Sequence, residues 1–168
     1  MKKYLTAILL LIAAVTVKSQ DIKNSIGIRG GYDNGIIYTV YTGINTEAEA
    51  LLTFREGGIQ AGIFSKKFSP VLLKYSDHFF LHYGIGGHLG YVSWEKGYKV
   101  NENGYDSYKF HNYHAPVIGA DLSASIEYRL YRIPCSVVLD YKPFFELPGR
   151  HFFNLNLWDF GLCFKYYF

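Results

Sequence analysis

The sequence lacks an apolar run long enough to cross a membrane as a helix. Its longest run covers residues 5–17 and has 13 residues, whereas a spanning helix needs ~20 residues. The chain also has no low-complexity linker and no block of like charges. At this length, these absences favour one domain and argue against a second.

The short apolar run has the flanks of a secretory signal peptide. Lys2 and Lys3 precede it, and small and polar residues follow it, which is the order of basic, apolar and cleavage regions in such a peptide. We expect cleavage between Ser19 and Gln20, which makes residues 1–19 the signal peptide and residues 20–168 the mature domain. No cysteine lies near this position, so we do not expect a lipoprotein anchor.

The mature chain also lacks an excess of either charge. The whole sequence has 17 Lys and Arg against 14 Asp and Glu, but Lys2, Lys3 and Lys18 belong to the expected signal peptide. The remaining charges balance at 14 of each sign. The basic pI of the full chain is therefore no evidence for a nucleic-acid partner, and we expect none.

Cysteine is scarce, with only Cys135 and Cys163. An exported protein meets conditions in which disulfides form. However, the alternation of the strands described below places the two residues on opposite faces of neighbouring strands, and a disulfide needs converging Cβ atoms. We predict two free thiols.

Aromatic residues and glycine are abundant instead. The chain has 16 Tyr, 13 Phe and 17 Gly. Tyrosine and phenylalanine favour strands, and aromatic rings also settle at membrane interfaces. The clearest strand is at the C-terminus, where large apolar residues occupy every second position from Trp158 to Phe168, and Asp159 and Lys165 lie between them. A period of two indicates a strand with two chemically different faces.

Turn residues and alternation divide the mature chain into eight expected strands. Asp33-Asn34-Gly35 is a hairpin turn signal, and Gly57-Gly58 is another. The expected strands are residues 25–32, 36–42, 49–56, 59–68, 78–94, 117–131, 135–145 and 154–168. Residues 95–112 form a long polar connection that we expect to be an exposed loop. The fourth strand has the weakest alternation, because Lys66 and Lys67 are adjacent and one of them must point outward.

Charged side chains share one face of these strands. On the sixth strand, for example, Asp121, Glu127 and Arg129 alternate with apolar residues. If the strands form a closed barrel of eight, its interior is only wide enough to be filled by side chains. We predict that the inward charges pair with one another there, as buried charges require; an open polar path for ions is the alternative. The predicted interior network is Arg29, Glu49, Arg55, Asp121, Glu127, Arg129, Asp140, Lys142, Asp159 and Lys165.

Other motifs carry less chemistry. The glycine-rich stretch at residues 84–90 has Leu89 where a dinucleotide motif needs its third glycine, and it lies within an expected strand. We expect Gly84, Gly86 and Gly90 to make room for large neighbours or to let the sheet bend. His82 and His88 share a face but lie six residues apart, which is nearly 20 Å along a strand at about 3.3 Å per residue. They cannot share one metal ion, and we expect neither a metal nor a cofactor.

Several segments together resemble the small eight-stranded outer-membrane β-barrel proteins of bacteria, of the Bacteroidetes type and similar to OmpA and OmpX barrels. They are IGIRGGYDNGIIY, EALLTFREGGIQAGIF, HYGIGGHLGY, VVLDYKPFF and the C-terminal strand. The resemblance implies an all-β, eight-stranded, antiparallel, transmembrane up-and-down β-barrel in the bacterial outer membrane, with periplasmic termini. It also implies an insertion signal read by the barrel-insertion machinery, consisting of Phe160, Leu162, Phe164, Tyr166 and Phe168.

The resemblance gives no specific activity, so three functions stay open. The first is a non-enzymatic, monomeric barrel with a filled interior, in contact with outer-membrane lipid and lipopolysaccharide. It either stabilises the outer membrane or presents residues 95–112 to an extracellular ligand. The second is an enzyme that transfers or removes lipid A acyl chains at the outer rim. Asp106, Ser107, His111 and His114 supply residue types for such nucleophilic chemistry. The third is a narrow channel for small solutes.

Overall fold

The computed structural model describes residues 24–55, 57–73, 76–102, 105–147 and 153–168. The predicted signal peptide and its cleavage site lie outside these ranges. All regular structure within them is β-strand, and all strand pairs are antiparallel. The strands are β1 (Asn24–Gly31), β2 (Asn34–Tyr41), β3 (Thr46–Arg55), β4 (Gly58–Leu73), β5 (Ser76–Glu102), β6 (Tyr105–Arg129), β7 (Cys135–Tyr141), β8 (Phe144–Leu147), β9 (Asn154–Asn156) and β10 (Phe160–Tyr167).

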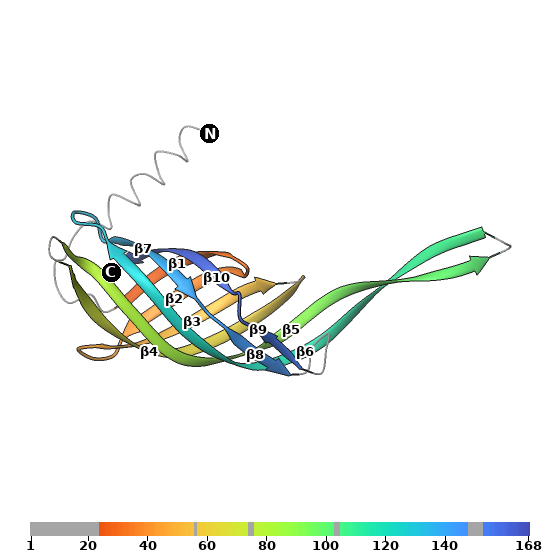
Figure 1. Cartoon of the computed structure of the whole chain (residues 1–168), viewed down its shortest axis with the longest axis horizontal. Helices are drawn as coiled ribbons and strands as arrows, with labels where there is room; N and C mark the ends of the chain where they lie inside the picture. The colour runs from red at the N-terminus through yellow and green to blue at the C-terminus, as the bar shows by residue number, and fades with distance from the viewer. Residues whose placement is uncertain (1–23, 56, 74–75, 103–104, 148–152) are drawn as a thin grey trace, which may run out of the picture.

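The ten strands form one sheet that is partly closed on itself. Consecutive strands pair from β1 to β7, β7 pairs with β10, and β10 returns to β1. Strands β8 and β9 continue the sheet beyond this circle. Figure 1 shows the result as a barrel-like body, with the C-terminus at one end. The predicted all-β, antiparallel character is confirmed.

Two predicted strands are interrupted in the structure. Residues 135–145 divide into β7 and β8 at Lys142 and Pro143, although both strands keep the same register on β6. Pro143 has no backbone N–H and cannot donate to a ladder, but its carbonyl accepts from the Leu122 N–H at 2.9 Å. Residues 154–168 divide into β9 and β10, and the pairing register shifts by one residue between them. The prediction of two continuous strands was therefore wrong.

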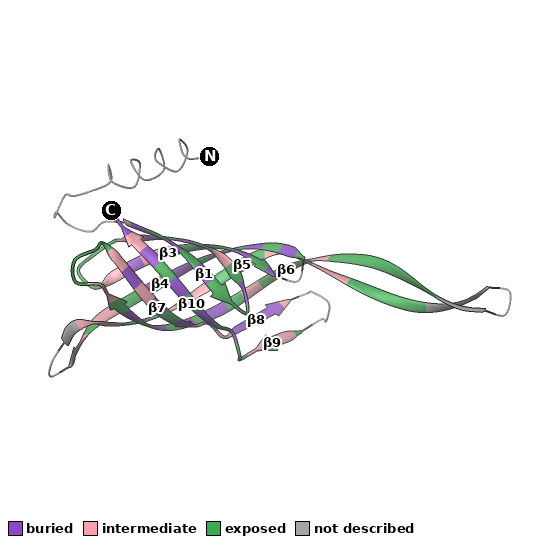
Figure 2. Cartoon of the chain, turned by 90° about the horizontal axis from the view of Figure 1, so that it is seen from above, coloured by how far each residue is buried: buried purple, intermediate pink, exposed green. Residues whose placement is uncertain are grey.

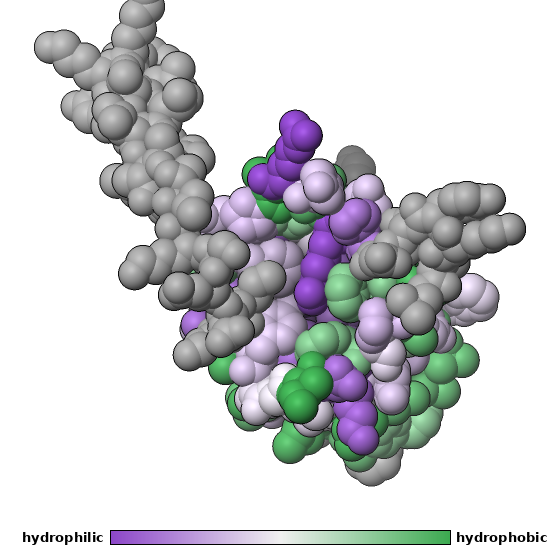
Figure 3. Space-filling view, turned by 90° about the vertical axis from the view of Figure 1, so that its left-hand side faces the viewer, coloured by the Kyte–Doolittle hydropathy of each residue, from purple (hydrophilic) through white to green (hydrophobic). Residues whose placement is uncertain are grey.

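Burial alternates along the strands as a period of two requires. Strand β1 alternates buried and exposed residues from Ser25 to Gly30, and β6 does so from Asp121 to Tyr128. Strand β4 places Lys66 inside and Lys67 outside, as predicted for one of these two adjacent lysines. Polar side chains fill most of the buried positions, whereas the exposed ones are mainly apolar. Figure 3 views the body from the end where the C-terminus lies. Hydrophilic side chains gather over the middle of this end, and hydrophobic ones lie along part of its perimeter.

Strands β5 and β6 extend far beyond the body as a two-stranded ribbon (Figure 1). We define the ribbon as residues 94–102 and 105–113, which pair from Trp94↔Tyr113 to Glu102↔Tyr105. Within the described residues, β4 pairs with β5 only as far as Tyr91, and β8 meets β6 only from Ile118. The loop predicted for residues 95–112 was therefore wrong. The ribbon has a polar composition because both of its faces meet solvent. The rings of Trp94 and Tyr113 stack at its base, with their centroids 6.0 Å apart.

Candidate functional site

Buried charges from distant strands meet inside the body. The Lys165 ammonium on β10 lies 2.8 Å from a carboxylate oxygen of Glu49 on β3, although β1 and β2 separate these strands in the sheet. Arg55 on β3 reaches Glu146 on β8 in the same way. Such contacts are possible only across an enclosed space, so these side chains share the interior.

The Arg29 guanidinium makes three hydrogen bonds in the interior. Its Nε donates to Asp140 at 3.0 Å, and its Nη2 donates to Asp159 at 2.7 Å. Its Nη1 donates to the backbone carbonyl of Asp33 at 2.9 Å. The guanidinium fork thus joins three separate strands or turns, and its side chain is fully shielded from solvent. Arginine suits this role because its donors have a fixed planar geometry.

Lys142 links the same group of acids from another side. Its ammonium lies 3.4 Å from Asp33, 3.5 Å from Asp159 and 4.0 Å from Asp121. Lys142 occupies the interruption between β7 and β8, where its backbone N–H donates to the Asp159 carbonyl at 2.8 Å. The break in the strand therefore positions a cation among three carboxylates.

Glu146 and His88 complete this half of the interior. The Glu146 carboxylate accepts hydrogen bonds from Arg55 and, at 2.8 Å, from Asn154. His88 lies with Nδ1 2.8 Å from Asp121 and Nε2 3.3 Å from Glu146. We call these connected side chains the ribbon-end cluster: Arg29, Asp33, Arg55, His88, Asp121, Asp140, Lys142, Glu146 and Asp159.

A second group lies nearer the C-terminal end of the body. Glu49 binds both Lys165 and Lys66. His82 lies between two carboxylates, with Nδ1 2.9 Å from Glu47 and Nε2 2.7 Å from Glu127. Arg129 is half-buried, 3.3 Å from Glu127, with its guanidinium 3.9 Å from the Phe80 ring centroid. The terminal cluster comprises Glu47, Glu49, Lys66, His82, Glu127, Arg129 and Lys165.

The two histidines balance the charge of the interior. Together the clusters hold eight carboxylates and six lysine or arginine side chains. Each ring nitrogen of His82 and His88 faces a carboxylate oxygen. An ionised carboxylate only accepts, so both nitrogens of each ring must donate, which requires the doubly protonated imidazolium. With both rings charged, cations and anions are equal in number.

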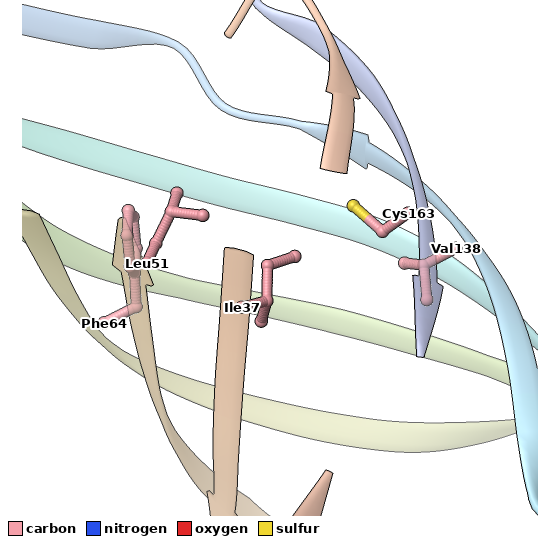
Figure 4. Packing of buried hydrophobic residues seen from close by; sticks show 5 residues of the cluster. All are labelled: Ile37, Leu51, Phe64, Val138 and Cys163. Atoms are coloured by element: carbon pink, nitrogen blue, oxygen red, sulfur yellow. The ribbon is translucent and has the colours of Figure 1, made fainter. Parts of the chain in front are cut away.

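An apolar belt lies between the two clusters. Cys163 on β10 is one of the buried residues between Asp159 of the ribbon-end cluster and Lys165 of the terminal cluster. Leu51 on β3 is one of those between Arg55 and Glu49. Figure 4 shows the side chains of this belt gathered from five strands: Ile37, Leu51, Phe64, Val138 and Cys163. Buried polar residues also lie between the clusters, such as Ser123 and Ser125 on β6, so the belt covers only part of this level of the interior.

Glycines admit the large interior side chains, as expected for Gly84, Gly86 and Gly90. A Cβ at Gly86 would collide with the Phe64 ring, and those at Gly84 and Gly90 would collide with backbone carbonyls of β4. Gly161 has a similar role, because its Cβ would lie 2.7 Å from the Arg29 guanidinium carbon. The large side chains of the belt and the clusters therefore fit only because these neighbouring positions are glycines.

The structure places the predicted network residues in these two clusters. Of the ten, nine are buried and Arg129 is half-buried. Sequence reasoning missed Asp33, Glu47, Lys66, His82, His88 and Glu146 as members. The alternation already placed His82 and His88 on the inward face, and this was a signal that both could join the charged network. Asp33 and Glu146 gave no such signal, because both lay in expected turns.

The structure does not gather the residues considered for lipid A chemistry. Positions 107 and 111 lie four residues apart on one extended strand, about 13 Å at 3.3 Å per residue. His111 pairs with Lys96 across the ribbon, whereas His114 pairs with Ser93 on the opposite face. The structure does not describe the side chains of Asp106 and Ser107. No group of three or more metal-binding side chains forms among the described residues.

The C-terminal pattern and the cysteines lie as the alternation predicted. Phe160, Leu162, Phe164 and Phe168 are exposed, and Tyr166 is half-exposed. Both cysteines are free. Cys163 pairs in register with Val138, whereas Cys135 pairs with Tyr166, so the two thiols do not converge and the prediction of free thiols is confirmed.

Comparisons with known proteins add no family. No protein-family model matches the chain, and no curated protein matches it. Among the described residues there is no helix of the length and hydropathy needed to span a membrane. A function must therefore be argued from the geometry.

Proposed function

We propose that the protein is an eight-stranded transmembrane β-barrel of the bacterial outer membrane with a non-enzymatic role. The observation that carries this proposal is the polarity of the body, which is the reverse of that in a soluble protein. Charged side chains fill the interior, and large apolar side chains such as Ile63, Ile85 and Leu89 are 64–73% exposed on the outside. Water-soluble monomers rarely expose apolar patches beyond a few hundred Å², whereas a membrane barrel turns its apolar face to lipid.

The strand geometry agrees with this placement. Counting β7 with β8 and β9 with β10 as interrupted strands gives eight, and an even number is usual for single-chain bacterial barrels. Strand β3 has 10 residues, within the ~9–11 that a tilted strand needs to cross a bilayer. The ribbon and the C-terminus lie at opposite ends (Figure 1). With periplasmic termini, the ribbon faces the cell exterior.

The interior supports a structural role over a channel. Its charges are paired, and the side chains of the apolar belt lie between the two clusters on five strands. Desolvated charges are tolerated when each has a partner, and the interior provides one for each cation described in the clusters. We propose that the clusters fix the shape of the barrel and that the ribbon is the part that meets other molecules.

Cell fractionation tests the proposal. In cells that produce the full chain, the protein should sediment with lipopolysaccharide-containing outer membranes on a density gradient. Trypsin added to intact cells should cut the ribbon, where Lys96 and Lys109 are exposed, and leave the body whole. Recovery in the soluble or inner-membrane fraction would contradict the proposal.

Lipid A analysis tests the non-enzymatic part. Mass spectra of lipid A from cells with and without the protein should be identical under several growth conditions. A mass change of one acyl chain that His111→Ala abolishes would show an enzyme instead.

A further inference from the structure

The two faces of the ribbon differ in charge. Directly opposed residues of an antiparallel pair project from the same face, so the register assigns each side chain. Over residues 94–98 and 109–113, the part of the ribbon next to the body, one face carries three rungs: Trp94 with Tyr113, Lys96 with His111, and Tyr98 with Lys109. We call these six residues the cationic face.

The cationic face is basic and aromatic and has no acid among its six residues. Lys96, Lys109 and His111 are exposed, and Tyr98 and Tyr113 are 45% and 40% exposed. The other face carries Glu95 opposite Asn112 and Gly97 opposite Phe110. Figure 2 shows that the coloured part of the ribbon, beyond the body, is mostly exposed. Over residues 94–98 and 109–113 the basic side chains therefore lie on one face, and this arrangement is not caused by burial.

The two lysines are placed to act together. Lys96 pairs with His111, so Lys109 is its diagonal neighbour on the facing strand, about 7–8 Å away. Flexible lysine stems of this separation can bring both ammonium groups to one anionic group. Lys96 also faces His111 directly. An anion between Lys96 and Lys109 reduces the repulsion between their two ammonium groups.

The aromatic rungs define what else the ligand must offer. Tyr98 and the stacked Trp94–Tyr113 pair lie on either side of the Lys96–His111 rung. Aromatic side chains have an apolar face and a polar edge, which fits the C–H face and hydroxyl groups of a sugar. Two lysines suffice for an isolated acidic group, but not for the charge every ~1.7 Å of duplex nucleic acid.

The direction of this face selects among sources of such a ligand. Its positions continue the inward side of the strands, since Val92 and Val117 on the same face are buried in the body. The opposite face continues the outward side through Tyr91 and His114. At its base, the cationic face therefore looks over the end of the barrel and away from the surrounding lipid.

We propose that the cationic face binds soluble oligosaccharides that carry carboxylate, sulfate or phosphate groups. Lys96 and Lys109 hold one acidic group, and Tyr98, Trp94 and Tyr113 pack against the sugar rings beside it. The inference rests on the proposed function for its extracellular setting, but not for its chemistry.

An array of immobilised oligosaccharides in matched neutral and acidic forms tests it. The purified mature protein in detergent micelles should bind acidic members over their neutral counterparts. The variant K96Q/K109Q should lose at least tenfold in affinity, and Tyr98→Ala should lose affinity without removing a charge. The control variant E95Q/H114Q changes the other face and should bind as the original does.

Binding is then measured in solution by fluorescence. The chain has two tryptophans, so a Trp158→Phe background leaves Trp94, on the cationic face, as the only tryptophan, which is excited selectively over tyrosine. Titration with an acidic oligosaccharide from the array should change its emission, and 0.5 M salt should weaken binding. Circular dichroism checks that each variant keeps its strands.

Four outcomes would overturn the inference. They are no binding to any acidic member, equal binding by K96Q/K109Q, tighter binding to single-stranded DNA, and tighter binding to anionic phospholipid vesicles. The last two would assign the face to nucleic acid or to a lipid headgroup. If fractionation contradicts the outer membrane but the array result holds, only the proposed location fails. If the location holds and acidic sugars do not bind, only this inference fails.

Discussion

Strands β5 and β6 pass through two environments, and the same alternation has different consequences in each. Inside the body, flanking strands bury one face of the pair, and His82, His88, Asp121 and Glu127 are 0–6% exposed there. In the ribbon, no described strand flanks the pair, and Lys96, Lys109 and His111 on the same face are exposed. A period-two pattern therefore fixes which residues share a face, but neighbouring strands decide whether that face is buried.

The difference also separates stability from recognition. Charges in the body are paired and shielded, so removing one leaves its partners buried without compensation. Charges in the ribbon stay hydrated, where single changes contribute little to stability. We expect substitutions in the body to alter the free energy of unfolding and substitutions in the ribbon to alter binding.

Arg29→Met should give the largest loss of stability. It leaves Asp140 and Asp159 without their shared cation, and breaking a buried pair in this way costs about 3–5 kcal/mol. Urea unfolding in phospholipid vesicles measures the change. Arg132→Met is the matched control, because Arg132 is exposed. Equal losses for the two variants would show that the interior network does not stabilise the body.

Gly86→Ala should have a smaller effect with a steric cause. The added Cβ collides with the Phe64 ring of the apolar belt, and overpacking of this kind costs about 1–3 kcal/mol. Combining it with Phe64→Leu should recover part of the loss in the same unfolding measurement. Gly30→Ala is the control, since the nearest atom to its Cβ is 3.9 Å away. No recovery in the double variant would refute the proposed contact.

Removal of most of the ribbon should have the smallest effect on the body. Residues 95–112 are replaced by Asn-Gly, which favours a tight hairpin turn between the directly opposed Trp94 and Tyr113. The free energy of unfolding should change by no more than about 0.5 kcal/mol, while binding to acidic oligosaccharides is lost. A large loss of stability would mean that the ribbon belongs to the cooperative unit of the body.

The sequence predicted most of the body because its strands have one buried face. The alternation around Cys163 and Lys165 on β10, for example, gave the orientation of both side chains. It could not give partners across the interior, such as Glu49 with Lys165, since those depend on how the sheet closes. It failed for residues 95–112, where neither face is buried and a strand pair has the composition of a loop. The sequence also did not predict the break at Pro143. The strands β7 and β8 on either side of it keep the same register on β6, and no local sequence signal indicates this.

Spin-label accessibility in lipid vesicles tests the central claim of an apolar exterior in contact with lipid. In a background with Cys135→Ser and Cys163→Ala, labels are attached at Ile85→Cys on the outside of the body and at Tyr98→Cys on the ribbon. Ile85 is 66% exposed and Tyr98 is 45% exposed, so solvent exposure alone predicts relaxation by a water-soluble nickel chelate at both sites. Our account predicts that membrane-dissolved oxygen dominates at position 85 and the nickel chelate at position 98. Dominance of the nickel chelate at position 85 would contradict the account.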